Sequence, residues 1–389
     1  MKKAFVLLAL FCLFIACPKT NCEVAKAEEV EKEISTEQIT DEVDFSALEQ
    51  YFYTLSPEQT SLFGGNIVEY IKKITNGEFN FETDFLSYIL SVLGVSAKSV
   101  LPMLTTIIAI AVLVAIINNL KGNFASQSIE KAVNFAGIAL LSTVVLIQIF
   151  SVIKRTDSLV GELSKQMEVV FPLLFTFMSA LGASGSVTVY QPAVATLSLS
   201  VTGLISKVAL PVLIATVVLS IVGNLSSSVK LNGFAKFLES SAKWVLYTAF
   251  FLFLGFLSLK GITAGVYDNM SVRTTKFALS KYVPVIGGYL SEGFNVILAG
   301  TVLVKNAVGF SSIVLMLSAF LPVIVEIIVL VLALKLASAI TQSLGCEQIS
   351  GVITSIGSSL SLLVSIVLGV CFAYFIFVVL IINSGNLVL

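Results

Sequence analysis

A carboxylate lies inside one of the apolar runs of this chain. Glu326 is five residues into the run 321–334, and Lys335 stands just after it. Burying an ionised carboxylate in hydrocarbon is costly, so such a residue is a candidate for an ion or substrate path. The alternative is a carboxylate near a membrane interface that is paired or hydrated. Lys207 and Lys305 stand beside other apolar stretches, and we expect their side chains to extend to the lipid headgroups.

Two short segments, 169–206 and 283–306, are interrupted by glycine. We expect each to form a helical hairpin, with breaks at Gly182-Ala183-Ser184-Gly185-Ser186, Gln191-Pro192, Gly287-Gly288, Ser291-Glu292-Gly293 and Gly300. Discontinuous helices in matching positions of repeated halves mark the substrate path of many transporters. The predicted polar path is therefore lined by Glu326, Gly182, Gly185, Gly287 and Gly288. The alternative is that glycine and serine only allow helices to pack closely.

The sequence lacks the residues and motifs that most soluble enzymes use for catalysis. The chain has no histidine, which excludes histidine-based acid–base chemistry, catalytic triads and histidine metal sites. It has no G-x-x-x-x-G-K-[ST] phosphate-binding loop, so energy would have to come from a partner or an ion gradient. Cys346 and Cys371 would lie at different depths, and we expect them to be unpaired. We predict no catalytic residue, no metal, no cofactor and no enzymatic activity.

Composition indicates a membrane protein. Hydrophobic residues make up 57% of the 389 positions and charged residues 12%, and the mean hydropathy is +0.98. This is too little charge to cover a soluble protein of this size. Apolar runs near the length of one span, about 20 residues, recur at 100–120, 132–153, 208–223, 244–259, 308–334 and 360–382. We predict an all-α, polytopic integral membrane protein with six to ten spans in the lipid bilayer. The net charge of −1 gives no reason to expect nucleic acid as a partner.

The first 27 residues resemble a secretory signal peptide. Lys2 and Lys3 precede an apolar run, and the segment ends in Ala25-Lys26-Ala27, the small-x-small pattern that signal peptidase reads. Cleavage after Ala27 would remove 1–27 and place the mature N-terminus outside the cytoplasm. Two alternatives stay open: lipidation of Cys17 in Phe14-Ile15-Ala16-Cys17, and an uncleaved first helix.

The next segment is expected to be extracytoplasmic. Residues 28–55 form an acidic arm, which we expect to be disordered because it has few apolar residues. Within 56–99 we expect amphipathic helices. Ser56-Pro57-Glu58-Gln59 is a capping box, and Asn76-Gly77 ends the helix that it begins. These helices either pack on the membrane domain or dock an extracytoplasmic partner.

The membrane part shows signs of repetition. Leu-Pro pairs at 101–102, 210–211 and 321–322 are spaced by 109 and 111 residues, which predicts tandem repeats of ~110 residues. The corresponding units are 100–168, 169–283 and 284–389. Polar connectors lie at 121–131, 224–243 and 336–359. An exported N-terminus places these connectors in the cytoplasm, although the lysines and arginines favour neither side.

The connector 224–243 and the basic stretch 261–283 are amphipathic. We expect both to form helices on the membrane surface, and the alternative is a cytoplasmic docking site for a motor protein.

The apolar runs that contain proline are similar to those of a known family. Together with the signal, the acidic arm and the Gly-Ser hairpins, three runs resemble the stage III sporulation protein AE family of endospore-forming bacteria: Val100-Leu101-Pro102-Met103, Val170-Phe171-Pro172-Leu173 and Ala209-Leu210-Pro211-Val212. The resemblance covers the chain from about residue 40 and rests on length and layout, because the family has no catalytic signature.

The resemblance implies a role in sporulation. It implies a polytopic member of a mother-cell operon whose products, with a forespore membrane protein, form a channel across the double membrane around the forespore. The partners would include a secretion-type ATPase and ring-forming proteins, and the location would be the mother-cell membrane. The chain would then be a permease-like core or platform. A non-conducting scaffold and a stand-alone secondary transporter are the alternatives.

Overall fold

The computed structural model describes residue 40 and residues 43–78, 81–119, 127–225, 231–282 and 287–384. The predicted signal peptide, its cleavage site, Cys17 and most of the acidic arm lie outside these ranges. The described residues form helices and contain no strand, which confirms the all-α prediction. In chain order the elements are α3 (Ser46–Phe52), α4 (Pro57–Ser61), α5 (Ile67–Thr75), α6 (Phe81–Asn119), α7 (Gln127–Ala180), α8 (Ser184–Leu204), the π-helix η1 (Ile205–Ala209), α9 (Leu210–Leu225), α10 (Asn232–Tyr282), α11 (Gly287–Ser343) and α12 (Glu347–Asn383).

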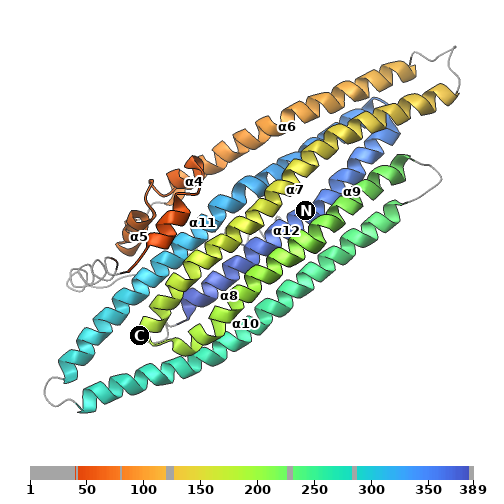
Figure 1. The fold of residues 1–389 in the computed structure, drawn as a ribbon. Helices are drawn as coiled ribbons and strands as arrows, with labels where there is room; N and C mark the ends of the chain where they lie inside the picture. Colours follow the sequence, from red (N-terminus) through yellow and green to blue (C-terminus); the bar gives the residue numbers. More distant parts are fainter. Residues whose placement is uncertain are drawn as a thin grey trace.

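The long helices lie lengthwise against one another in one elongated bundle (Figure 1). Helix α7 has 54 residues and α11 has 57, which corresponds to lengths of about 80 and 85 Å. The hydrocarbon core of a bilayer is only about 30 Å thick. Single helices of this bundle are therefore more than twice as long as a membrane crossing requires.

The two ends of the bundle carry different turns. The connections α6–α7, α9–α10 and α11–α12 share one end, and the α7–α8 and α10–α11 connections share the other (Figure 1). We call them the Cys346 end and the Gly182 end, after a residue in one turn of each, and name the two halves of the bundle accordingly. The described helix ends that flank the three polar connectors, which the sequence predicts on one side of the membrane, thus lie at one end.

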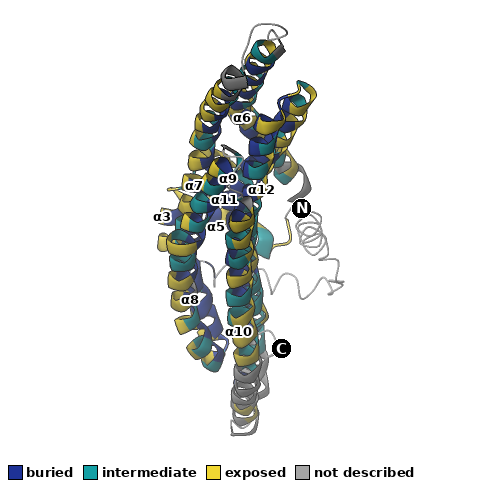
Figure 2. Cartoon of the chain, turned by 90° about the vertical axis from the view of Figure 1, so that its right-hand side faces the viewer, coloured by how far each residue is buried: buried dark blue, intermediate teal, exposed yellow. Residues whose placement is uncertain are grey.

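Six stretches of the described residues are long and apolar enough to cross a membrane. They lie in α6, α7, the continuous α8–η1–α9 rod, α10, α11 and α12, which is the lower limit of the predicted six to ten. Helix α11 is the centre of the bundle, where it contacts α6, α7 and α12. Buried residues gather on the faces where helices meet, and exposed residues follow the outer faces (Figure 2).

Of the predicted helix breaks, those at Gly182 and at Gly287 coincide with helix boundaries, and the other three do not. Helix α7 ends at Ala180 and α8 begins at Ser184, with Gly182 at a φ of +77° between them. The break predicted at Gln191-Pro192 is wrong, because α8 continues through Pro192. Within the described part of segment 283–306 there is no hairpin either, since α11 begins at Gly287 and runs without interruption to Ser343. Packing against neighbouring helices outweighs the weak helix propensity of its glycines.

Three further expectations need correction. The stretches 232–243 and 261–282 are not separate surface helices, because both belong to the single rod α10. The part of 56–99 that begins at Phe81 is not a separate amphipathic helix, because it is the beginning of α6 and continues into the first apolar run. The arm 28–55 contains α3, which is ordered because Leu48 and Phe52 are buried on one face. The ~110-residue repeat stays a prediction, and two of its unit boundaries fall inside α6 and α7.

The N-terminal helices form as the sequence predicts. The Ser56 hydroxyl accepts from the Gln59 N–H, and the Gln59 side chain accepts from the Ser56 N–H, so the capping box is confirmed. It begins only α4, because the chain turns again before α5. Helix α5 buries Ile67 and Ile71 and ends before Asn76. Helices α3 to α5 pack beside α7 and α11, about midway along the bundle (Figure 1).

Candidate functional site

Glu326 is buried on α11, with 2% of its surface exposed. Its carboxylate accepts from the guanidinium of Arg155 on α7 at 2.5 Å. Of the two readings of Glu326, the structure therefore shows the paired carboxylate. Arg155 is half exposed, so one member of the pair lies inside the bundle and the other lies at its surface. Sequence reasoning missed this partner, although the charged stretch 154–168 in the middle of α7 was a signal for it.

The structure does not bring Glu326 to the predicted glycines. Gly182 lies 27 residues beyond Arg155, which corresponds to about 40 Å along a helix. Gly287 and Gly288 begin α11 at the Gly182 end of the bundle. The four glycines thus share one end, whereas Glu326 lies near the middle of the bundle, beside Arg155 in the middle of α7. The predicted polar path has no common site in this arrangement.

The glycine break is tied to α10 by a buried carboxylate. Asp268 is 4% exposed and accepts from the backbone N–H of Gly185 at 2.8 Å, from that of Ser186 at 3.0 Å and from the Ser186 hydroxyl at 2.5 Å. These N–H groups belong to the first turn of α8, where the helix dipole is positive and the amides have no helical partner. Asp268 is thus the anion that this terminus requires. The signal in the sequence was that Asp268 is the sole acidic residue of 261–282.

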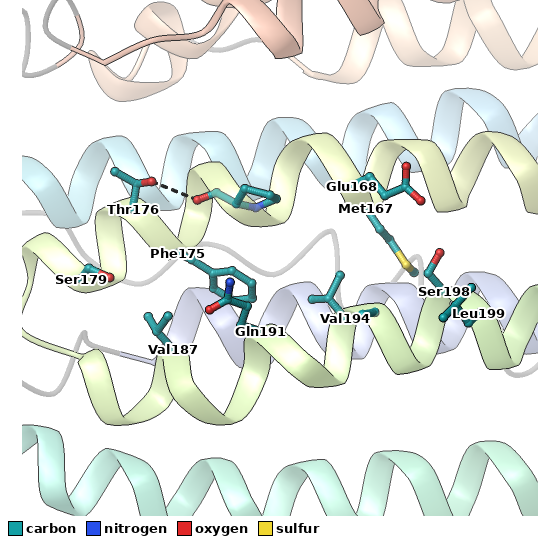
Figure 3. A pocket seen from close by; sticks show the side chains of 12 residues that line it. Met167, Glu168, Phe175, Thr176, Ser179, Val187, Gln191, Val194, Ser198 and Leu199 are labelled. Atoms are coloured by element: carbon teal, nitrogen blue, oxygen red, sulfur yellow. Dashed lines mark hydrogen bonds between the residues drawn. The ribbon is translucent and has the colours of Figure 1, made fainter.

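A groove lies between the second half of α7 and α8 (Figure 3). Its volume is about 700 Å³. Met167, Phe175 and Val194 give it an apolar floor, and Glu168 and Gln191 stand among its polar lining. The lining has a carboxylate but no nucleophile paired with a base, so it offers shape and apolar contact rather than chemistry.

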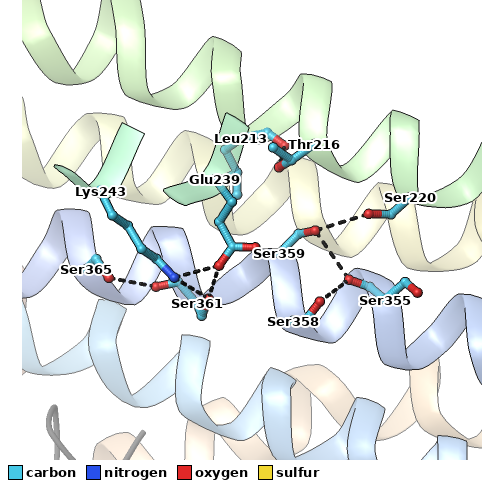
Figure 4. Close-up of polar contacts among 10 residues, drawn as sticks. All are labelled: Leu213, Thr216, Ser220, Glu239, Lys243, Ser355, Ser358, Ser359, Ser361 and Ser365. Carbon is cyan, nitrogen blue, oxygen red and sulfur yellow. Dashed lines mark hydrogen bonds and ion pairs between the residues drawn. The ribbon is translucent and has the colours of Figure 1, made fainter. Parts of the chain in front are cut away.

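A row of polar side chains joins α12 to α9 and α10 in the Cys346 half (Figure 4). Asn224 donates to the Ser355 hydroxyl at 3.1 Å. Glu239 and Lys243 form an ion pair at 2.5 Å, and both contact the Ser361 hydroxyl, at 2.6 and 2.7 Å. We call these five residues the polar seam. The sequence placed Glu239 and Lys243 on a surface helix, because their partner lies more than a hundred residues away.

Lys305 does not extend to the headgroups, which corrects the prediction. Its side chain is fully buried on α11, and its ammonium donates to the carbonyl oxygens of Ile382 at 2.9 Å and Ser384 at 2.5 Å. These are carbonyls at the C-terminus of α12, where the helix dipole favours a cation. Lys305 thus ties the end of α12 to α11.

Other predicted features can be placed directly. Cys346 and Cys371 are both buried and unpaired, as expected. Within the ranges that the structure describes, no group of three histidine, cysteine, aspartate or glutamate residues could hold a metal ion. The polar groups of this chain therefore tie helices together, and three of these contacts contain a buried ionisable side chain: Glu326, Asp268 and Lys305.

Comparisons with known proteins agree on one family. A family model described as Stage III sporulation protein AE (spore_III_AE) matches residues 65–385. Stage III sporulation protein AE of Bacillus subtilis (strain 168) is 24% identical over 325 residues, which cover 83% of this chain and 80% of that protein. No solved structure matches. Because the family model spans all six candidate membrane stretches as well as α5, this chain belongs to the stage III sporulation protein AE family.

Proposed function

We propose that this protein is the polytopic membrane component of a channel that links mother cell and forespore, and that sporulation requires it. The observation that carries the proposal is the family match over 65–385. Its partners are then the ring-forming proteins and the secretion-type ATPase of the same operon and, through them, a forespore membrane protein. Its location is the mother-cell membrane that surrounds the forespore.

The packing of the Gly182 half supports a platform. Phe171 of α7 packs against Tyr374 and Phe377 of α12, with ring centroids 5.8 and 5.0 Å apart. All three rings are fully buried, so they fill the centre of that half. A rigid bundle of this kind suits a component that holds other proteins in position.

The polar seam supports a permease-like core as the second candidate. It places an ion pair and several hydroxyls between α9, α10 and α12 in the half where the outer surface is apolar. Polar groups inside a membrane bundle are costly unless they are paired or hydrated. A conducting path through the chain would run along this seam rather than along the four glycines.

Sporulation of variants separates the two candidates. In the host with its own copy deleted, we would express the chain carrying Ser361→Leu, which places a bulky apolar side chain on the seam. A conducting core predicts loss of sporulation while the protein still accumulates and its partners still co-purify. A platform predicts that sporulation persists as long as that assembly forms. The matched control is Ser358→Leu, the same change at an exposed position of the same helix.

The proposal as a whole has a simpler test. Deletion of the gene must block sporulation after engulfment, and the unmodified chain must restore it. Normal spore formation by the deletion strain would refute the proposal. Substrate uptake by the purified chain alone in vesicles would instead favour a stand-alone transporter.

A further inference from the structure

The outer face of α7 changes character halfway along the helix. Between 132 and 150 its large exposed side chains are apolar: Phe135, Leu140, Ile147 and Phe150. From Lys154 to Ala180 every exposed residue is charged, polar or small, namely Lys154, Arg155, Asp157, Ser158, Glu162, Lys165, Glu168, Pro172, Thr176, Ser179 and Ala180. One straight helix thus presents two surfaces that suit two different solvents.

The rod α8–η1–α9 shows the same change in the opposite chain direction. Its α8 part exposes Thr188, Gln191, Thr196 and Ser200, and among its described side chains Leu199 is the one large apolar exception. Its other part, which runs toward the Cys346 end, exposes Lys207 at the boundary and then the valines at 208, 218 and 222.

Helix α10 repeats the pattern. Its first part exposes nine large apolar side chains between Phe234 and Leu259, including Trp244 and Phe251. Lys260 follows at once and is exposed. The next 22 residues contain Asp268, Arg273 and two lysines, and among their described side chains Phe277 is one large apolar residue that is exposed. Three rods therefore each place a lysine where an apolar surface stops: Lys154, Lys207 and Lys260.

The apolar surface has the height of a lipid layer. On α7 it covers 132–153, which is about 33 Å of helix, and a bilayer has about 30 Å of hydrocarbon. On α10 it covers 234–259, about 39 Å, which fits a tilted crossing. It also includes Leu113 and Ile116 on α6 and Leu332 on α11, so it lies on several helices and is not a single patch for one partner protein.

We propose that lipid covers only the Cys346 half of the bundle and that the Gly182 half projects from the membrane into water. In this arrangement Lys154 and Lys207, which lie close to the contact between Asp157 and Ser206, meet the headgroups. Apolar residues inside the projecting half, such as Val304 and Phe320 on α11, are buried by neighbouring helices and need no lipid. Leu199, Phe277 and Ile297 are exposed there, as single apolar side chains often are on a surface that faces water.

The projecting half lies on the same side of the membrane as the N-terminal helices. The Tyr51 hydroxyl of α3 points to the backbone carbonyl of Glu162 on α7, at 3.5 Å, in the charged stretch just beyond the boundary. Burial, with a further contribution from the Glu162 carboxylate, raises the pKa of Tyr51, so this phenol stays neutral. With an exported N-terminus, the projecting half is extracytoplasmic. The inference goes beyond the proposed function, because it holds whether or not the chain conducts.

Spin labels at matched positions test the placement. Thr143 and Thr188 are both exposed, and each hydroxyl donates to the carbonyl four residues earlier, yet they lie in different halves. The full chain with Thr143→Cys or Thr188→Cys would be labelled with a nitroxide and placed in phosphatidylcholine vesicles. Collisions with oxygen, which concentrates in lipid, would be compared with collisions with a water-soluble nickel chelate. We expect oxygen to dominate at 143 and nickel to dominate several-fold at 188.

A second pair makes the result independent of one site. Val218→Cys should behave like the label at 143, and Ser179→Cys like the label at 188. The unmodified chain measures background from its native cysteines, and circular dichroism confirms the helix content of each variant. Oxygen-dominated collisions at 179 and 188 would overturn the proposal, because the whole bundle would then lie in lipid. Shielding of 143 and 218 from both reagents would also overturn it, since protein and not lipid would cover the apolar surface.

Discussion

Removing the Asp268 carboxylate should loosen the junction between α7 and α8 without unfolding the bundle. Asp268 is the acceptor for the N–H groups of Gly185 and Ser186 and for the Ser186 hydroxyl. Asp268→Ala leaves both amides at the start of α8 without this partner. Because the site is buried, water replaces the lost acceptor only when the junction opens.

The size of the effect follows from the two amide hydrogen bonds. A hydrogen bond to a charged group contributes about 1.5–3 kcal/mol, and loss of an N-cap acceptor typically costs about 1 kcal/mol. We take ~3 kcal/mol for the pair of amides at the low end of the first range. Since each 1.4 kcal/mol is about a factor of ten, amide exchange through local opening should rise on the order of 100-fold. Asp268→Asn keeps one carbonyl acceptor, and we expect roughly a tenfold rise.

Hydrogen–deuterium exchange followed by mass spectrometry measures this directly. The peptide that covers 182–190 should lose protection, while peptides from α5 and from the Cys346 half should not change. Glu168→Gln is the matched control, because it removes an exposed carboxylate from the same half. Unchanged exchange of 182–190 in Asp268→Ala would refute the argument. An equal loss in the control would do so as well, because the effect would then reflect charge rather than the contacts of Asp268.

Three further substitutions test other contacts. Arg155→Ala should cost about 3 kcal/mol of stability because it leaves the buried Glu326 carboxylate without its partner. Glu326→Gln should cost about 1 kcal/mol or less. Thermal unfolding in detergent would measure both, and equal losses of stability in the two variants would contradict the argument. Lys305→Met removes the cation from the C-terminus of α12 and should lower stability by about 2 kcal/mol, seen as faster amide exchange confined to the last turn of that helix. Gly182→Ala forces a side chain into left-handed backbone and should cost about 1–2 kcal/mol, measured as a lower melting temperature.

The features that the sequence predicted correctly are local. The capping box of α4 and the helix end at Asn76-Gly77 depend on residues within one turn. The break at Gly182 depends on a glycine that adopts positive φ. At such positions the backbone conformation is decided by neighbours in sequence, so a pattern of a few residues is sufficient.

The features that it missed depend on distant partners. Arg155 and Glu326 are 171 residues apart, and Gly185 and Asp268 are 83 apart, so no local pattern could pair them. The breaks predicted at Ser291-Glu292-Gly293 and Gly300 failed for a related reason. Each glycine costs a helix only about 1 kcal/mol relative to alanine. The long contacts of α11 with α6, α7 and α12 decide that segment instead.

A hydropathy profile also equates apolar length with membrane depth, and this bundle shows why the two differ. Almost every residue of α11 from 301 to 320 is buried by protein, and the facing part of α12, around Tyr374 and Phe377, is buried too. The buried leucines, valines and phenylalanines among them raise the mean hydropathy as strongly as Phe251 or Leu252, which face outward on α10. Lipid can contact only the second kind. The membrane boundary of such a chain must therefore be read from the exposed side chains of its helices and not from the length of its apolar runs.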